Sequence, residues 1–131
     1  MAELLHELDA HIPDPGAAVG SLSGGQRQAV AICRALNLDA RLVIMDEPTA
    51  ALAVAETRKV LSLARKLAER GCAVVLISHN LVDVFEVADR MVVFRRGRKI
   101  AERRREATHT DEIVSLITGA HPDARALEAV A

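Results

Sequence analysis

Two acidic residues stand side by side directly after an aliphatic run. Asp46 and Glu47 follow Leu-Val-Ile-Met at residues 42–45. An Asp at the end of a buried strand is well placed to hold Mg²⁺ beside phosphate oxygens, because a hard cation prefers carboxylate oxygen. The neighbouring Glu can orient or deprotonate water for in-line attack on a terminal phosphate. The alternative is that the two acids cap the next turn, and the pair alone leaves both interpretations open.

A histidine follows a second apolar run. Residues 73–77 read Ala-Val-Val-Leu-Ile and are followed by Ser78 and His79. An imidazole at that place could contact the same phosphate as the acidic pair. A lone His at a strand end is more often an ordinary turn or core residue. Only its position beside the strand of the acidic pair favours a functional role.

A glycine-rich segment, Leu22-Ser23-Gly24-Gly25-Gln26, opens a helix. Two glycines let a phosphate approach backbone N–H groups, the helix N-terminus favours an anion, and the Ser23 hydroxyl adds a donor. A flexible N-cap is the structural alternative. Gly20 and Gly25 have the G-x-x-x-x-G spacing of a phosphate-binding P-loop, but Gln26-Arg27 follows in place of Lys and Ser or Thr. We therefore expect the group that binds the phosphates from the other side to lie outside this sequence.

Two strands and a helix must position these groups. Residues 42–45 and 73–77 predict strands buried on both faces, and residues 54–70 predict a helix that Gly71 ends. Strand, long helix and strand form a right-handed crossover, so the two strands should be parallel. Ligands bind at the carboxyl ends of such strands, where the acidic pair and the histidine lie. The side of the helix predicted to be buried contains Val60, Leu61, Ala64, Leu67 and Ala68.

The rest of the chain predicts further short elements. Residues 2–9 favour a helix, 12–20 a loop, and a helix beginning near Gly24 has Ala29, Ile32, Cys33 and Leu36 on its apolar side. A short helix is expected over 81–88, and the segment 91–102 predicts a hairpin around Arg96-Gly97. Thr110 or Asp111 could cap a last helix that runs to about Thr118. We expect a loose tail over 120–131.

Composition narrows the function classes. With 131 residues, 50% of them hydrophobic, the chain should form one small compact domain. A net charge of −1 and only two aromatic residues argue against nucleic-acid binding. Cys33 and Cys72 have no metal-ligand spacing and indicate reduced core residues of a cytosolic protein. No apolar run approaches the ~20 residues that cross a bilayer, so we expect no direct membrane insertion. The basic cluster over 95–105 is interpreted as a solvated hairpin rim.

The order of the motifs resembles a known family. LSGGQ at 22–26, LVIMDEPT at 42–49 and LISH at 76–79 are similar to the C-terminal part of ABC transporter ATP-binding subunits. The resemblance covers about residues 3–119. The segments VGSLSGGQRQAVAICRAL and ADRMVVFRRGRKIAE look like those of bacterial ribose, xylose and fructose importer ATPases. The implied fold is α/β, part of the P-loop NTPase fold of ABC ATPases, with a C-terminal hairpin and helix.

The resemblance implies a role for each motif. The signature loop, Leu22, Ser23, Gly24, Gly25 and Gln26, would bind across a dimer to the nucleotide of a partner subunit. Asp46 would be the Walker B carboxylate for Mg²⁺, through water, Glu47 the catalytic base, and His79 the switch histidine that senses the terminal phosphate. The implied substrate is ATP, and the implied partners are a second ATPase subunit or domain and a membrane permease. The implied location is the cytoplasm, at the inner face of the cell membrane.

Two departures from the family pattern matter. The D-loop after Walker B usually ends in Asp, whereas Ala53 follows Leu52 here, which puts communication between the two sites in doubt. The Walker A loop, the adenine-stacking aromatic and the Q-loop glutamine would lie before Met1. We therefore expect residues 1–37 to end the helical signature region and 38–119 to form the Walker B core with its hairpin and helix. An apolar edge or face of the sheet should then be exposed.

Three hypotheses follow. The leading one is a fragment of a sugar-importer ATPase that is inactive alone. The rival is a non-catalytic interaction fragment that donates its signature loop to a chain bearing Walker A. A chromosome-maintenance ATPase also uses a signature loop, but it would need a long coiled coil, and no sustained heptads precede residue 22.

Overall fold

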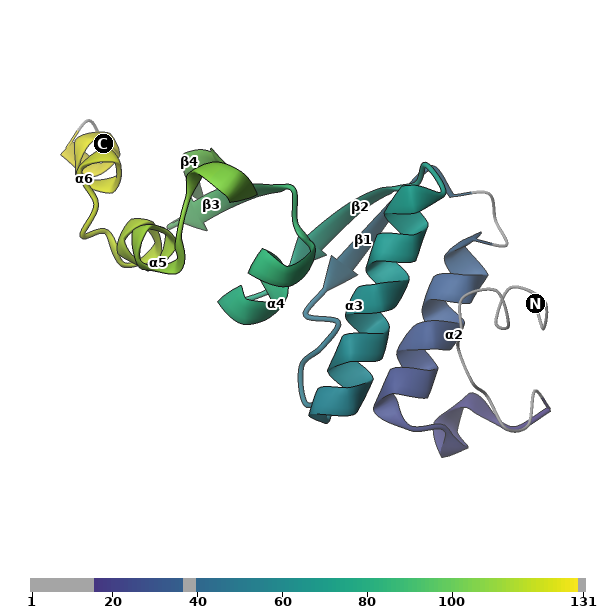
Figure 1. Cartoon of the computed structure of the whole chain (residues 1–131). Helices are drawn as coiled ribbons and strands as arrows, with labels where there is room; N and C mark the ends of the chain where they lie inside the picture. The colour runs from purple at the N-terminus through teal and green to yellow at the C-terminus, as the bar shows by residue number, and fades with distance from the viewer. Residues whose placement is uncertain (1–15, 37–39, 130–131) are drawn as a thin grey trace. The chain divides into compact units, whose positions relative to one another are not determined.

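The computed structural model describes residues 16–36 and 40–129 and groups the chain into two compact units, Met1–Asp83 and Val84–Ala131 (Figure 1). The expectation of a single small domain stays a prediction. The helix expected over 2–9 and the first part of the loop expected over 12–20 lie outside the described residues. The predicted apolar position Leu36 lies outside the described side chains. No helix in the described ranges is both long and apolar enough to cross a membrane.

A parallel two-stranded sheet organises the first unit. Strand β1, Leu42–Asp46, pairs with β2, Ala73–Ile77, in a register that places Leu42 opposite Ala73 and Asp46 opposite Ile77. Helix α3, Val54–Glu69, connects the two strands, as the crossover pattern predicts. Helix α2, Gly24–Leu36, packs beside α3, and Figure 1 shows both helices on the same side of the sheet.

The core of this unit lies between the sheet and the two helices. Its buried residues are Ala29, Ile32, Cys33, Val43, Met45, Leu63, Ala64, Leu67 and Cys72. The prediction of strands buried on both faces is wrong for this structure. The side chains that alternate away from the helices remain exposed because only one face of the sheet is covered: Leu42 52%, Ile44 63%, Val75 44% and Ile77 48%. The expected exposed apolar face is therefore present.

Local signals set the ends of α3. Gly71 adopts φ 84°, a left-handed conformation that glycine takes without steric cost, and the helix ends just before it. At the other end Ala53 is the N-cap, with extended backbone and no side-chain capping bond. One predicted buried position is wrong: Ala68 lies in the last turn and is exposed, whereas Leu63 is buried.

The second unit contains the C-terminal hairpin. Helix α4, Leu81–Val87, leads into β3, Arg90–Arg95, which pairs antiparallel with β4, Arg98–Arg104. Arg96 and Gly97 both have positive φ, 48° and 75°, as a type I′ turn requires, and the predicted hairpin is confirmed. A register shift between Val93 and Phe94 marks a bulge. Two helices follow, α5 over Thr110–Thr118 and α6 over Pro122–Ala129.

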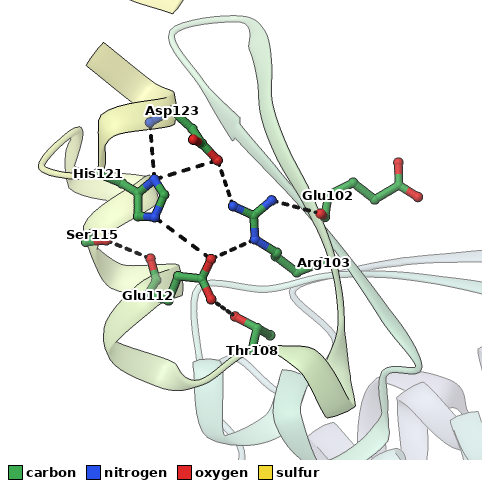
Figure 2. A network of polar contacts seen from close by, with 7 residues as sticks. All are labelled: Glu102, Arg103, Thr108, Glu112, Ser115, His121 and Asp123. Atoms are coloured by element: carbon green, nitrogen blue, oxygen red, sulfur yellow. Dashed lines mark hydrogen bonds and ion pairs between the residues drawn. The ribbon is translucent and has the colours of Figure 1, made fainter. Parts of the chain in front are cut away.

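Two expectations about the C-terminal region are corrected. His109, with extended backbone, is the N-cap of α5, so Thr110 and the residue after it already lie inside the helix. Most of the tail that was expected to be loose forms α6. A polar network holds this helix: Arg103 of β4 donates from Nη2 to Asp123 and from Nε to Glu112, each at 2.7 Å (Figure 2). Sequence reasoning assigned the tail no partner because the partners come from another strand and helix.

Candidate functional site

The carboxyl ends of the two parallel strands bring the predicted catalytic residues to one edge of the sheet. Strand β1 ends at Asp46 and β2 at Ile77. The backbone N–H of Glu47 donates to the carbonyl of Ile77 at 2.8 Å, which extends the pairing by one step. The side chains that follow the two strands, Glu47 and His79, are thereby placed next to each other.

Glu47 and His79 form a direct hydrogen-bonded pair. Oε1 of Glu47 lies 2.8 Å from Nδ1 of His79 and also accepts the backbone N–H of His79 at 3.1 Å. Glu47 adopts a left-handed φ of 47°, a conformation that costs about 1–3 kcal/mol in a non-glycine residue and persists only where its surroundings impose it. The hydrogen bond to the Glu47 carboxylate, together with its negative charge, raises the pKa of His79. The pair is open to solvent, with the imidazole 82% exposed.

Asp46 is the exposed last residue of β1 and suits a magnesium ion that is shared with a nucleotide. Within the described residues, no cluster of three or more His, Cys, Asp or Glu side chains is arranged to hold a metal ion. Mg²⁺ commonly keeps several waters and takes one or two carboxylates plus substrate phosphates, so a single exposed Asp at a strand end fits that mode. A metal site built from protein ligands alone would need more donors than this region presents.

The glycine-rich segment is held by a capping box. The N–H of Gln26 donates to Oγ of Ser23 at 3.3 Å, and the N–H of Ser23 donates to Oε1 of Gln26 at 2.9 Å. The structural alternative, an N-cap at Ser23, is therefore present, although the reciprocal bonds make it an ordered cap. Both functional and capping interpretations use the same side chain, and the role of residues 22–26 toward phosphate stays a prediction.

The two glycines of this segment also meet a packing requirement. A Cβ on Gly24 would lie 2.6 Å from Cδ2 of Leu52, and one on Gly25 would lie 3.1 Å from Cβ of Glu56. Leu52 ends the turn after Glu47, and Glu56 lies in the first turn of α3. Close contact of the start of α2 with Leu52 and Glu56 thus favours small residues at 24 and 25, a reason for glycine that the sequence alone did not reveal.

Sequence reasoning missed two further residues that hold the turn after Glu47. Oγ1 of Thr49 donates to Oδ2 of Asp83 at 2.6 Å, and Asp83 is 4% exposed. Nε2 of Gln28, on α2, donates to the carbonyl of Pro48 at 3.2 Å. A possible signal was the polar residue Asp83 at an apolar spacing in α4, since a buried acid needs a partner.

The sequence is similar to those of known ABC transporter proteins. The ABC transporter family matches residues 1–50. The xylose/arabinose import ATP-binding protein XylG of Sulfolobus acidocaldarius is 49% identical over 88% of this chain and 46% of its own length. The fructose import ATP-binding protein FrcA of Rhizobium meliloti is 48% identical over 87% of this chain and 43% of its own. The chain spans about half the length of these two curated relatives.

Solved structures give the same fold. A nucleotide-free ATP-binding cassette from an ABC transporter superposes with a TM-score of 0.73 at 28% identity, over 97% of this chain and 47% of that one. The dimeric structure of a bacterial ABC transporter cassette, MJ0796, superposes with a TM-score of 0.66 at 30% identity, over 79% of this chain and 44% of that one. The α/β arrangement of parallel strands, crossover helix and C-terminal hairpin is thus part of the P-loop NTPase fold of ABC cassettes. The chain is therefore similar to part of the ATP-binding proteins of ABC transporters, and the relatives named above are import ATP-binding proteins for xylose or arabinose and for fructose.

Proposed function

We propose that this chain supplies the signature loop, the Walker B acids and the switch histidine of an ATP-hydrolysing subunit in a carbohydrate importer. The observation that carries the proposal is the Glu47–His79 pair, joined at 2.8 Å where two parallel strands end and next to Asp46. A carboxylate that is hydrogen-bonded to an imidazole at such an edge is suited to accept a proton from water, and the imidazole is suited to respond to a phosphate charge placed beside it.

The proposed roles follow from where each group lies. Asp46 would hold Mg²⁺, in part through water, and the ion would supply charge neutralisation to the phosphate oxygens. Glu47 accepts a proton from the attacking water, and His79 keeps the Glu47 carboxylate oriented through its Nδ1 and backbone N–H. Residues 22–26 present the start of α2, which favours an anion, to a nucleotide held by another subunit.

The partners are proposed from relatives. The bacterial cassette MJ0796 forms a dimer, and the named relatives are import proteins for xylose or arabinose and for fructose. We infer a second ATPase subunit or domain and a membrane permease as partners, with the chain in the cytoplasm at the inner face of the membrane. Within this scheme residues 1–37 belong to the signature region, and 38–119 form the Walker B core with its hairpin and helix.

A second candidate is a non-catalytic fragment that donates its signature loop to a chain bearing Walker A. One observation favours it: one face of the β1–β2 sheet exposes Ile44 and Val75, an apolar surface that a second chain could cover. In that case the acids and the histidine would be dispensable while the glycines would not.

One set of measurements separates the two candidates. We expect no measurable Mg-ATP affinity for the 131-residue chain alone in isothermal titration, and tight magnesium-dependent binding would contradict the scheme. ATP turnover is then measured after addition of a separately expressed chain that carries G-x-x-x-x-G-K-[ST]. Glu47→Gln should lower the rate by roughly 10²–10⁴-fold if Glu47 is the base. A loss with Gly25→Asp but none with Glu47→Gln would instead favour the non-catalytic fragment.

A further inference from the structure

Asp83 is the one charged side chain that is buried among the residues the structure describes, at 4% exposure. It lies in the first turn of α4, where a helix favours negative charge. Burial of a carboxylate costs free energy unless hydrogen bonds replace the lost water. The hydroxyl of Thr49 provides such a bond at 2.6 Å, a short length that is typical of a hydroxyl donating to a carboxylate.

The bond connects the same two chain segments as the Glu47–His79 pair. Thr49 comes two residues after Glu47, and Asp83 comes four residues after His79. The Glu47–His79 contact is exposed to water, whereas the Thr49–Asp83 contact is part-buried. Solvent weakens the first bond more than the second, because charge-assisted hydrogen bonds are stronger where water is excluded. The buried bond is therefore the firmer of the two connections.

The turn over residues 47–52, which contains Glu47 and Thr49, is strained. Glu47 and Ala51 both have positive φ, 47° and 60°. Backbone bonds from Ala50 N–H to the Glu47 carbonyl and from Leu52 N–H to the Thr49 carbonyl close the turn locally. The bond from the Glu47 N–H to the Ile77 carbonyl fixes the start of the turn at the end of β2. The bond from Thr49 to Asp83 fixes the following part of the turn against the start of α4.

We propose that Thr49 and Asp83 are a positioning pair that holds the Glu47 carboxylate against His79. Neither residue touches the reacting atoms; both act through Glu47. The consequence for turnover rests on the proposed function, whereas the consequence for the Glu47–His79 contact does not.

The decisive experiment needs no nucleotide. The ¹⁵N-labelled 131-residue chain is compared with its Thr49→Val variant, and the exchange rate and shift of the His79 backbone amide are measured by NMR. That amide donates to Glu47, so its proton should exchange about tenfold faster and its shift should move when the turn loosens. Thr49→Ser keeps a hydroxyl and should restore both values. Thr57→Val, the same chemical change in the first turns of α3, is the matched control and should leave His79 unchanged.

The outcomes are distinct. A Thr49→Val chain that melts at a lower temperature but keeps the His79 amide signal of the parent would show a merely structural bond and overturn the proposal. If Thr49→Val does not fold, Asp83→Asn replaces it. The side-chain amide oxygen of the new Asn accepts a weaker bond from Thr49, so the proposal requires the His79 amide to exchange faster than in the parent chain but less than tenfold faster.

A second readout concerns turnover in the presence of a chain bearing Walker A. Thr49→Val should lower kcat roughly 10–100-fold and leave KM unchanged, because only the placement of the base changes. Added to Glu47→Gln, it should cause little further loss, since both changes act on one group. Absence of all turnover would count against the proposed function and not against the pair, which the amide measurement judges separately. Full additivity of the two substitutions would overturn the pair.

Discussion

The Nδ1 atom of His79 and the Oε1 atom of Glu47 lie 2.8 Å apart, although 32 positions of sequence separate the two residues. Their contact depends on the parallel pairing of β1 and β2 in the register that sets Asp46 beside Ile77. A shift of the pairing by one residue would turn each side chain to the opposite face. The contact is thus a sensitive measure of the sheet register.

The contact predicts a titration result. The carboxylate raises the pKa of His79, so Glu47→Gln should bring this pKa down toward that of an ordinary histidine, measured by proton NMR of the imidazole. Because the pKa is raised on folding, the pair stabilises the fold fully below the unfolded-state value of about 6.5 and loses this contribution as pH rises through the folded-state pKa. Glu69→Gln, which removes the same charge from the end of α3, is the control. A pKa that stays raised in Glu47→Gln would assign the shift to another group.

The uncapped start of α3 predicts a stabilising substitution. Ala53 is the N-cap of α3 and forms no side-chain cap bond, and Glu56 occupies the third helical position. Ala53→Asp or Ala53→Ser should raise the free energy of unfolding by about 1 kcal/mol, measured by urea denaturation. Ala55→Asp adds the same charge inside the first turn without a cap geometry and should give a smaller gain. Equal gains from both Asp variants would mean that the helix dipole, and not capping, is responsible.

Contact between the glycine-rich segment and Leu52 predicts a coupling. Gly24→Ala places a methyl group 2.6 Å from Cδ2 of Leu52, so Leu52 must move. We expect a loss of about 1–3 kcal/mol, part of which Leu52→Ala should recover in the double variant. Gly20→Ala, where a Cβ meets nothing within 4 Å, is the matched control. Strict additivity of the two changes in a denaturation cycle would show that the residues do not contact each other in solution.

The polar network of the second unit predicts local opening. Arg103 joins Glu112 of α5 and Asp123 of α6, and its hydrogen bond is the main reason that the pKa of Glu112 is lowered (Figure 2). Partly exposed ion pairs contribute about 1 kcal/mol, which corresponds to roughly a fivefold change in an opening equilibrium. Arg103→Gln should therefore speed amide exchange in α6 by roughly that factor. Arg104→Gln, at a more exposed neighbour, should have little effect. Since the Glu112 pKa is lowered, its contribution persists at neutral pH and fades as pH falls through that pKa.

The exposed face of the β1–β2 sheet predicts association. Ile44 is 63% and Val75 44% exposed, and both lie on the face that the helices leave uncovered. We expect the isolated chain to self-associate in sedimentation velocity, and Ile44→Lys with Val75→Lys to reduce this. The pair Val82→Lys and Val114→Lys, exposed residues on helices, serves as the control. A monodisperse parent chain that melts cooperatively as a monomer would contradict the prediction.

Much of the fold was predictable from local signals. Gly71 and the Arg96-Gly97 turn both require positive φ, and the chain turns where those residues stand. The aliphatic runs at 42–45 and 73–77, separated by one long helix, required a parallel pair, because a crossover of that length allows few other connections. The placement of Glu47 and His79 at one edge followed from that topology.

Other features depend on contacts that no local pattern contains. The Thr49–Asp83 bond and the role of Gly24 against Leu52 join segments that are distant in sequence. Helix α6 was missed because its stabilising partner, Arg103, lies in a strand. The prediction that β1 is buried on both faces was wrong because an aliphatic run indicates that a strand is apolar but does not indicate whether one or both of its faces are covered.

The cap at Ser23 leaves a hydrogen-bond donor available at the start of α2. Its oxygen already receives the Gln26 amide hydrogen, so one lone pair is occupied and the single hydroxyl hydrogen must rotate elsewhere. A visiting group with lone pairs can accept that hydrogen, and the backbone N–H groups in the first turn of a helix also offer only hydrogens. A group that has only hydrogens to offer, such as an ammonium ion, is left with the second lone pair of the Ser23 oxygen. The start of α2 therefore favours groups that accept hydrogen bonds before any full charge on the protein comes into play.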